Sequence, residues 1–463
     1  MSRKSKTLIA ALAALVLLSG AYYGSTVWTK RKSDAKVQPF TPSPKLGNLE
    51  GSELVRMELL NLTLENEDGI WKLKSVKGAL PPAGIELDQM QIMSLIYSLA
   101  SLWIDSVVDE EPLDLSAYGL DNQYVSRVTI TDSAGTQAVY LVGNMTPSRS
   151  AYYVMEEGDP KVYAVSAYLV GNMNIPLERI RQKSLFPVFQ FPEFISFTME
   201  SSGTVIEIME KPDILRPYLA STYTSHLLTS HYALARGISN DIFSELLSPF
   251  NSLGIDDFID DNPASLERYG LDKPVRIILR TINDTLDLLI GNQVEGKRYA
   301  KLTGAPGVFT LRGLESAVSI KPFELIDKFI LLVNIDNVDH IEITGGEKIL
   351  TADIQRYGDE EDFFLNGKKT QDRAFRNFYQ SVIGLLADAE YPRGSSADQA
   401  TGRDNSITIE HFLNTPPGQR VSITLIPYNR DFYAVSQEGA TEFLVSRDQV
   451  QRIYNMADAM VYE

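Results

Sequence analysis

Four histidines are the first residues that could ligate a metal: His226, His231, His340 and His411. Only His226 and His231 are close in sequence, and they stand five residues apart. On a helix this spacing turns the two imidazoles about 140° from each other, whereas a metal site uses residues four apart on one face. No carboxylate stands at ligand spacing beside them. We therefore expect ordinary hydrogen-bonding side chains in a polar insertion, and we predict no metal ligand.

Three runs of acidic residues are candidates for calcium: residues 109–111, 256–261 and 359–362. Counting from Asp256 places Glu267 at the last position of a would-be EF-hand loop. In that frame Phe258 occupies a ligand position and Asp261 occupies the position of the turn glycine, so the loop fails. We expect these acidic runs to be solvated loops.

The common catalytic motifs are missing from the sequence. Gly367-Lys368-Lys369 lacks the upstream glycine of a phosphate-binding loop, and there is no dinucleotide fingerprint and no G-x-S-x-G elbow. A hydrolase with paired carboxylates needs two acids close in space, and 60 Asp and Glu residues do not nominate them. We predict no catalytic residue and no cofactor, and we keep such a hydrolase as an alternative.

The composition narrows the class of protein. The 463 residues include 43 Lys and Arg against 60 Asp and Glu, a net charge of −17, which argues against nucleic acid as a partner. The absence of cysteine excludes disulfides, thiolate metal sites, cysteine nucleophiles and a lipid-modified cysteine. The 22 tyrosines could stack on sugars or contact proteins, although tyrosine is also a good strand former.

An uncharged stretch from Thr7 to Trp28 predicts a single membrane-spanning helix. Its 22 residues would form a helix about 33 Å long, enough to cross a bilayer core of about 30 Å. Arg3, Lys4 and Lys6 precede it and favour a cytoplasmic N-terminus, although a second basic cluster follows it. A cleaved signal peptide is the alternative, because Ser19-Gly20-Ala21 offers small residues for cleavage. Either interpretation places the bulk of the chain outside the cytoplasm.

Without the basic N-terminal residues 1–36, the rest of the chain has a more negative net charge than the whole. Residues 37–463 hold 36 basic and 59 acidic residues, a net charge of −23. Such a surface stays solvated and disfavours docking on anionic lipid. Residues 37–53 include three prolines without hydrophobic periodicity, which predicts a linker between the membrane and the rest.

A four-residue motif repeats along the chain. Tyr118-Gly119-Leu120-Asp121 recurs as Tyr269-Gly270-Leu271-Asp272, 151 residues later. In each copy Gly can take the left-handed conformation that redirects the chain, Leu anchors it, and Asp begins a turn into a strand. We expect the two tyrosines to be packed aromatic residues with hydrogen-bonded hydroxyls.

The sequence around each motif copy predicts the same series of elements. A hairpin and a helix precede the motif, and four alternating strands and a closing helix follow it. The strands are predicted at 125–130, 138–144, 151–155 and 162–165, and again at 275–279, 286–292, 298–302 and 308–311. The closing helices are predicted at 167–181 and 313–327, and the preceding helices at 88–104 and 240–253. A third, diverged series lacks the motif and has a loop around 393–404 instead.

These patterns predict an α+β protein with three related modules after the anchor. Each module consists of a hairpin, a helix, an antiparallel four-strand meander and a closing helix. The predicted boundaries are 1–36 for the tip, anchor and basic flank, 37–53 for the linker, and 54–190, 191–333 and 334–463 for the modules. The second module carries an insertion near 211–237 with helix-forming and polar sequence.

Several of these motifs together resemble the bacterial domain-of-unknown-function family 4340. The resemblance is carried by an Asp-Gly turn followed by a strand that contains Trp71, then by the Tyr-Gly-Leu-Asp motif, then by a strand that ends in Val142-Gly143-Asn144. It is closest over residues 54–185, reappears over 194–330 and is faint afterwards.

The resemblance implies a bacterial, membrane-attached, extracytoplasmic protein, similar to those encoded beside ABC-type transport and gliding-associated components. It implies no catalytic residue. We therefore expect a non-enzymatic, single-pass accessory or binding protein of the cell membrane, anchored by residues 7–28, with subunits of an ABC-type transporter or envelope complex as partners. The alternatives are a module that binds an envelope glycan and the carboxylate-dependent hydrolase.

Overall fold

The computed structural model describes residues 45–47, 49, 54–100, 102–121, 126–211, 224–346, 348–358, 360–392, 405–414 and 417–463. The predicted anchor at 7–28 and the loop at 393–404 lie outside these residues. Within the described residues, no helix combines the length and apolar character needed to cross a membrane. The chain divides into two compact units. Unit 1 contains the residues up to Pro81 and Glu86–Arg181, and unit 2 contains Pro82–Ile85 and Gln182–Glu463.

The fold is α+β with antiparallel sheets, as predicted for its class. Unit 1 has an eight-stranded sheet in the order β4-β3-β2-β7-β8-β9-β10-β6. Its strands are β2 (Leu54–Glu58), β3 (Leu62–Glu67), β4 (Ile70–Val76), β6 (Ser106–Asp109), β7 (Ser126–Asp132), β8 (Gln137–Met145), β9 (Ala151–Glu156) and β10 (Val162–Ser166). A separate short pair joins β1 (Lys45–Leu46) to β5 (Leu102–Trp103).

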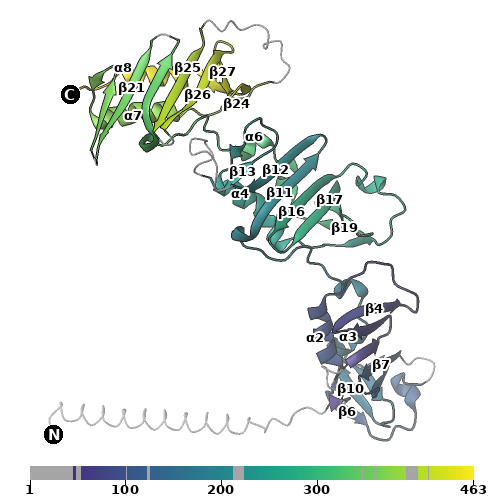
Figure 1. Cartoon of the computed structure of the whole chain (residues 1–463). Helices are drawn as coiled ribbons and strands as arrows, with labels where there is room; N and C mark the ends of the chain where they lie inside the picture. Colours follow the sequence, from purple (N-terminus) through teal and green to yellow (C-terminus); the bar gives the residue numbers. More distant parts are fainter. Residues whose placement is uncertain are drawn as a thin grey trace, which may run out of the picture. The chain divides into compact units, whose positions relative to one another are not determined.

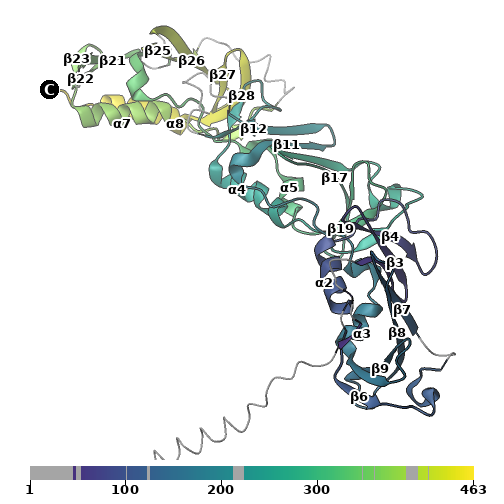
Figure 2. The same ribbon diagram turned by 60° about the horizontal axis from the view of Figure 1, so that its bottom comes forward.

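Helices α2 (Gln89–Leu99) and α3 (Ala167–Met173) cover one face of this sheet (Figure 2). The carboxylate of Asp88 caps α2 by accepting hydrogen bonds from the first free N–H groups. The spacing of Ile92, Leu95, Ile96 and Leu99 then places four buried side chains on the face of α2 that meets the core.

Unit 2 contains two nine-stranded sheets, which we call the second and third sheets (Figure 1). The second sheet has the order β14 (Arg236–Gly237), β13 (His226–Leu228), β12 (Thr204–Glu210), β11 (Phe194–Ser201), β16 (Val275–Thr281), β17 (Thr285–Val294), β18 (Lys297–Leu302), β19 (Val308–Leu311) and β15 (Phe258–Asp260). Its helices are α4 (Asn240–Leu247), α5 (Glu315–Ser319) and α6 (Pro322–Leu325).

The third sheet has the order β23 (Lys368–Lys369), β22 (Glu360–Leu365), β21 (Leu350–Tyr357), β20 (Val338–Thr344), β25 (Ile407–Asn414), β26 (Pro417–Pro427), β27 (Phe432–Gln437), β28 (Ala440–Ser446) and β24 (Ala389–Glu390). Helices α7 (Asp372–Ile383) and α8 (Arg447–Asp458) lie side by side against it (Figure 2).

The same strand order recurs in all three sheets. The first hairpin strand (β2, β11 or β20) pairs with the first meander strand (β7, β16 or β25). A short strand before the meander (β6, β15 or β24) pairs with the last meander strand (β10, β19 or β28). These short strands were not predicted from the sequence, because two to four residues carry too little alternation to indicate a strand.

Several predicted helices are shorter in the structure. The helix expected over 88–104 ends at Leu99, and the one expected over 167–181 ends at Met173. The one expected over 313–327 is split into α5 and α6, and the one expected over 240–253 gives way to a 3-10 turn after Leu247. Pro176 and Pro322 explain two of these ends, because proline lacks the N–H that a continuing helix needs.

The insertion near 211–237 also differs from the prediction. Where helix-forming sequence was expected, β13 and β14 extend the second sheet at its edge. Residues 212–223 of this segment lie outside the described part of the chain.

One continuous cluster of buried apolar side chains runs through both sheets of unit 2, from Phe186 to Met460. The second and third sheets therefore share a core rather than meeting only through a linker.

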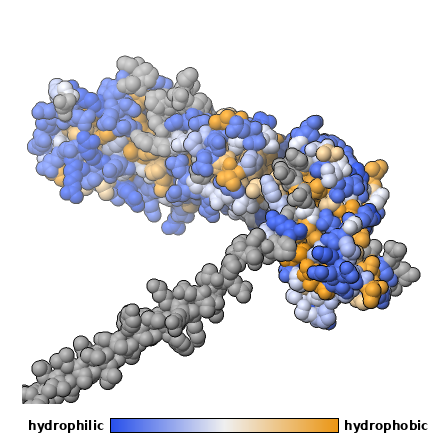
Figure 3. Space-filling view, turned by 90° about the horizontal axis from the view of Figure 1, so that it is seen from below, coloured by the Kyte–Doolittle hydropathy of each residue, from blue (hydrophilic) through white to orange (hydrophobic). Residues whose placement is uncertain are grey.

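The outer surface is largely hydrophilic in the view of Figure 3, with hydrophobic residues scattered among polar ones. The net charge of −17 agrees with a well-solvated surface.

Candidate functional site

The connection between the second and third sheets is hydrogen-bonded to both of them. The N–H of Asp327 donates to the carbonyl of Gly237 in β14 at 2.7 Å. The same segment also pairs with the residues just before β24 of the third sheet. The N–H of Ala387 donates to the carbonyl of Lys328 at 2.8 Å, and the N–H of Ile330 donates to the carbonyl of Leu385 at 2.9 Å. Residues 326–330 therefore fix the two sheets to each other through the main chain.

A buried ion pair lies at the same junction. The guanidinium of Arg236 in β14 donates to Gln437 at 3.2 Å and to Glu442 at 3.5 Å, and it lies 4.7 Å from the ring centre of Phe443. The second oxygen of Glu442 accepts from the N–H of Ala233 at 2.7 Å. Burial lowers the pKa of Arg236, and the charge of Glu442 opposes that shift. Because the side chains of Arg236 and Glu442 are 8% and 6% exposed, removal of either charge leaves the other uncompensated.

A cavity of about 340 Å³, which we call the junction cavity, opens beside this ion pair. Its lining comes from the loop between β13 and β14, from β24 and the two residues that follow it, and from β28. The lining residues are His231, Tyr232, Glu390, Tyr391, Pro392 and Glu442. Aromatic and acidic side chains thus surround one space, which has the size of a small-ligand pocket.

Glu390 is held in the wall of the junction cavity by two neighbours. The hydroxyl of Tyr232 donates to Glu390 at 2.7 Å, and the Nε2 atom of His231 lies 3.3 Å from the same oxygen. Burial, and then the hydrogen bond to Glu390, raise the pKa of Tyr232, so this hydroxyl keeps its proton and donates. The orientation of the Glu390 carboxylate is therefore set by residues more than 150 positions earlier in the chain.

Glu390 and Glu442 also bring two carboxylates to one cavity, which is the arrangement that a carboxylate-dependent hydrolase would need. Both oxygens of Glu442 already accept hydrogen bonds from the protein, one from Ala233 and one from Arg236. Glu442 therefore acts as a fixed part of the junction, and Glu390 is the carboxylate that the cavity presents.

The histidines are placed differently from the prediction. His226 lies on strand β13 and not on a helix, and its ring stacks on Phe243 at 3.6 Å between centroids. Within the described part of the chain, its Nδ1 atom is buried and has no hydrogen-bond partner, and burial lowers the pKa of His226. The expectation of an ordinary hydrogen-bonding side chain in a polar segment is therefore wrong for His226. His231 fits that expectation better, through its contact with Glu390.

The remaining histidines belong to the third sheet. The Nδ1 atom of His340 lies 2.7 Å from Asp353 on the neighbouring strand, and His411 is buried in the core. No group of three or more His, Asp and Glu side chains in the described part of the chain could hold a metal ion.

The acidic run at 256–261 is ion-paired rather than simply solvated. Asp256 contacts Arg312 at 2.7 Å, and Asp257 contacts Lys297 at 2.5 Å. The hydrogen bond from Lys297 is the main reason why the pKa of Asp257 is lowered. The expected solvated loop is therefore a small charge network. Its partners, Lys297 at the start of β18 and Arg312 just after β19, lie too far along the chain for a local sequence window to associate them with it.

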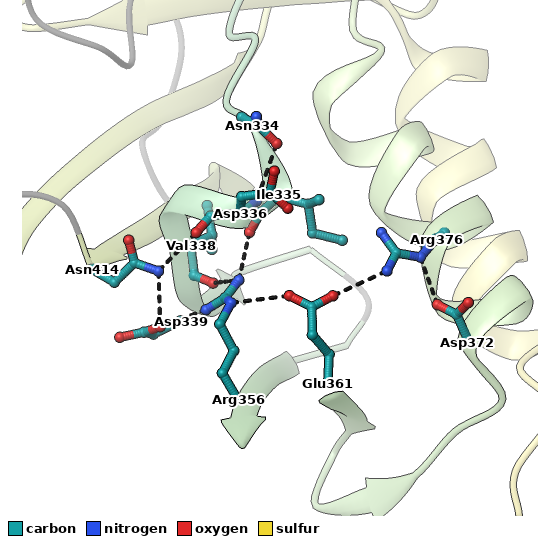
Figure 4. Close-up of polar contacts among 10 residues, drawn as sticks. All are labelled: Asn334, Ile335, Asp336, Val338, Asp339, Arg356, Glu361, Asp372, Arg376 and Asn414. Atoms are coloured by element: carbon teal, nitrogen blue, oxygen red, sulfur yellow. Dashed lines mark hydrogen bonds and ion pairs between the residues drawn. The ribbon is translucent and has the colours of Figure 1, made fainter. Parts of the chain in front are cut away.

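A second polar network anchors the start of the third sheet (Figure 4). Arg356 donates to the carbonyls of Ile335 and Val338 at 2.8 and 3.0 Å, to Asp339 at 2.8 Å and to Glu361 at 3.0 Å. All of its donor nitrogens are thereby engaged. This arginine ties the chain that enters β20 to the strands β21 and β22.

Glu361 extends this network to helix α7, as Figure 4 shows. Its other oxygen accepts from Arg376 at 3.0 Å, and Arg376 also donates to Asp372 at 2.6 Å. The acidic run at 359–362 therefore supplies a bridge between a strand and a helix. We interpret this network as structural, because each of its charged side chains has an oppositely charged partner within the protein.

The two copies of the Tyr-Gly-Leu-Asp motif have nearly the same geometry. Gly119 and Gly270 end short 3-10 turns with φ angles of 69° and 68°, and Leu120 and Leu271 are buried. The hydroxyl of Tyr118 donates to Asp109 at 2.8 Å, and that of Tyr269 donates to Asp260 at 2.9 Å. Each tyrosine ring also packs edge-on against a strand tyrosine, Tyr153 or Tyr299. The aspartates of the motif differ: Asp272 is exposed, whereas one oxygen of Asp121 is buried and has no hydrogen-bond partner among the described residues.

The family model described as Domain of unknown function (DUF4340) matches residues 80–259 and, again, residues 227–404. Together the two matches span well over half of the chain. The chain belongs to the DUF4340 family. No curated protein and no solved structure matches it.

The two matches to one DUF4340 model agree with the repeated motif. They overlap over 227–259 and extend beyond the residues on which the resemblance was based. Trp71, one of those residues, precedes the first match and is buried, with its N–H donating to Gln89 at the start of α2. The junction cavity could not be predicted, because Tyr232 and Glu390 are separated by 158 residues and neither belongs to a motif.

Proposed function

We propose that this DUF4340 protein is a non-enzymatic, single-pass accessory or binding protein of the cell membrane, with an extracytoplasmic bulk. The observation that carries the proposal is the apolar stretch 7–28 ahead of an acidic series of sheets. Its partners are subunits of an ABC-type transporter or of another envelope complex. The family resemblance supports this choice of partner.

We also propose that the three sheets derive from one module. The recurring strand order and the two matches to one family model support this origin. In this proposal the second and third modules are fixed to each other by the ion pair of Arg236 and Glu442. A protein made of such modules offers several related surfaces on which a membrane complex can assemble.

The partner proposal is tested by affinity purification of the full chain from membranes of its own organism. We expect transporter or envelope-complex subunits to co-purify with the full chain and to be reduced when residues 1–36 are deleted. Reproducible recovery of no such subunit would contradict the proposed partner.

The anchor is tested separately. We expect the protein to stay in the membrane pellet after an alkaline wash and to retain its N-terminal residues when the mature protein is sequenced. A mature N-terminus near Ala21 would instead establish the signal-peptide alternative.

A second candidate function is the binding of an envelope glycan. The observation that favours it is the junction cavity, where Tyr232 and Tyr391 could stack on sugar rings. Saturable binding of purified envelope glycan by the full chain, weakened by Tyr391→Ala, would support this function. A flat titration would dismiss it.

A further inference from the structure

The junction cavity contains one carboxylate that the fold has oriented and left accessible. The side chain of Glu390 is 44% exposed, although one of its oxygens is fixed by Tyr232 and His231. The other carboxylate in the wall, Glu442, is 6% exposed and balanced by Arg236. A ligand that enters the cavity therefore meets the negative charge of Glu390.

Aromatic side chains form much of the remaining wall. Tyr232 and Tyr391 both line the cavity, and the ring of Tyr391 packs edge-on against Tyr428 at 5.6 Å. Rings fixed in this way offer electron-rich faces at little cost in conformational entropy. A carboxylate beside aromatic faces is the combination that attracts an organic cation.

The surroundings of the cavity already pair cations with aromatic rings. Arg236 lies over Phe443 at 4.7 Å, and the ammonium of Lys328 lies over Phe323 at 3.2 Å. Burial lowers the pKa of Lys328, and the charge of Glu390 opposes that shift. The ammonium of Lys328 thus partly balances the charge of Glu390. A cationic ligand must interact with Glu390 more strongly than Lys328 does, through direct contact. The strongly acidic chain as a whole favours the approach of a cation.

We propose that the junction cavity binds a ligand that carries an alkylammonium group. Glu390 is the counter-ion and a hydrogen-bond acceptor for the ammonium, and Tyr232 and Tyr391 contact its alkyl part and its charge. The cavity of about 340 Å³ accommodates a small amine or the amine-bearing end of a larger molecule. This inference deepens the proposed binding function and requires neither the anchor nor the transporter partner.

The test is a calorimetric titration of the purified full chain in detergent at pH 7, with 1,5-diaminopentane as the probe and 1,5-pentanediol as its neutral match. We expect saturable binding of the diamine and none of the diol. Glu390→Gln should weaken the binding of the diamine by about tenfold or more, which corresponds to about 1.4 kcal/mol. The exposed control Glu210→Gln should bind as the wild type does.

Two further variants make the outcome specific. Tyr391→Phe should retain most of the affinity, because the ring is kept, whereas Tyr391→Ala should lose it. Thermal unfolding of each variant checks that the fold survives. Equal binding of diamine and diol, unchanged affinity in Glu390→Gln, or no binding of the diamine would each overturn the proposal. Binding of a neutral N-acetylglucosamine trisaccharide without the diamine would also overturn it, and would favour the glycan function. None of these results depends on whether transporter subunits co-purify.

Discussion

Gly143 on strand β8 lies directly against the main-chain carbonyl of Tyr118. A Cβ atom at position 143 would stand 2.2 Å from that oxygen, and one at Gly291 would stand 2.1 Å from the carbonyl of Tyr269. Neither glycine has a positive φ angle, so the restriction is one of space and not of backbone conformation. The two motifs Tyr-Gly-Leu and Val/Ile-Gly-Asn are therefore halves of one packed contact, formed once in unit 1 and once in unit 2.

Gly291→Ala should destabilise unit 2, because the obstructing atom belongs to the backbone and cannot rotate away. We expect a loss of about 1–3 kcal/mol, the usual cost of overpacking, with Gly143→Ala giving a similar loss in unit 1. Thermal unfolding followed by circular dichroism measures both. Gly171→Ala is the matched control, because no described atom lies within 4 Å of its added Cβ. Alanine should slightly raise the stability of α3, since glycine is less favourable inside a helix. An unchanged unfolding temperature for Gly291→Ala would contradict this account.

The contact at Gly143 separates the features that could be predicted from the sequence from those that could not. The repeat and the turn at Gly119 were predictable, because both depend on neighbouring residues. That Asn144 packs against Gly119 in space required the strand register, which no local window contains. The two helices that end before Pro176 and Pro322 are different, because the prolines that stop them are visible in the sequence. There the hydrophobic periodicity, which continues past each proline, predicted helices that were too long.

Removing only one partner of the buried ion pair between Arg236 and Glu442 should strongly lower the stability of unit 2. Glu442→Ala removes the acceptor of Ala233 and leaves the guanidinium of Arg236 uncompensated, so we expect a loss of about 3–5 kcal/mol in unit 2. Urea unfolding of the full chain measures the loss. The double variant Arg236→Met with Glu442→Leu should recover much of it, because it removes both charges together. A double variant as unstable as Glu442→Ala alone would show that packing, and not charge, dominates there.

The junction could not be predicted from the sequence for a related reason. Arg236 and Glu442 are ordinary charged residues in their own segments, and only the shared core of the second and third sheets makes them a buried pair. Runs of like charge stand out in the sequence instead. The run at 256–261 is paired with Lys297 and Arg312, and the described residues of the three runs form no metal site.

Arg356→Lys should weaken the start of the third sheet although it conserves the charge. A lysine cannot reach two carbonyls and two carboxylates at once, as the planar guanidinium does (Figure 4). We expect a loss of about 1–3 kcal/mol, since hydrogen bonds to charged groups are among the stronger ones. Hydrogen exchange of residues 335–339 measures the loosening directly. The exposed Arg452→Lys is the control, and in this variant residues 335–339 should exchange as they do in the wild type. Equal protection of these residues in both variants would contradict the anchoring role of Arg356.

His411 should make the stability of unit 2 depend on pH. The residue is buried in β25, neither ring nitrogen has a hydrogen-bond partner among the described residues, and burial lowers its pKa from 6.5 to about 4. The unfolded chain therefore binds a proton at a higher pH than the folded chain does. The stability contributed by the neutral ring is complete above pH 6.5 and falls as the pH drops towards 4, by up to about 1.4 kcal/mol per pH unit.

His411→Leu should remove this dependence, because leucine has no proton to gain. Between pH 7 and pH 5 the wild type should lose about 2 kcal/mol more of its unfolding free energy than the variant does, as measured by urea denaturation at each pH. At pH 7 the leucine variant should be at least as stable as the wild type, because two buried nitrogens without partners are replaced by an apolar side chain. If His411→Leu and the wild type lose the same free energy between pH 7 and pH 5, the ring of His411 is protonated or hydrated within the folded protein.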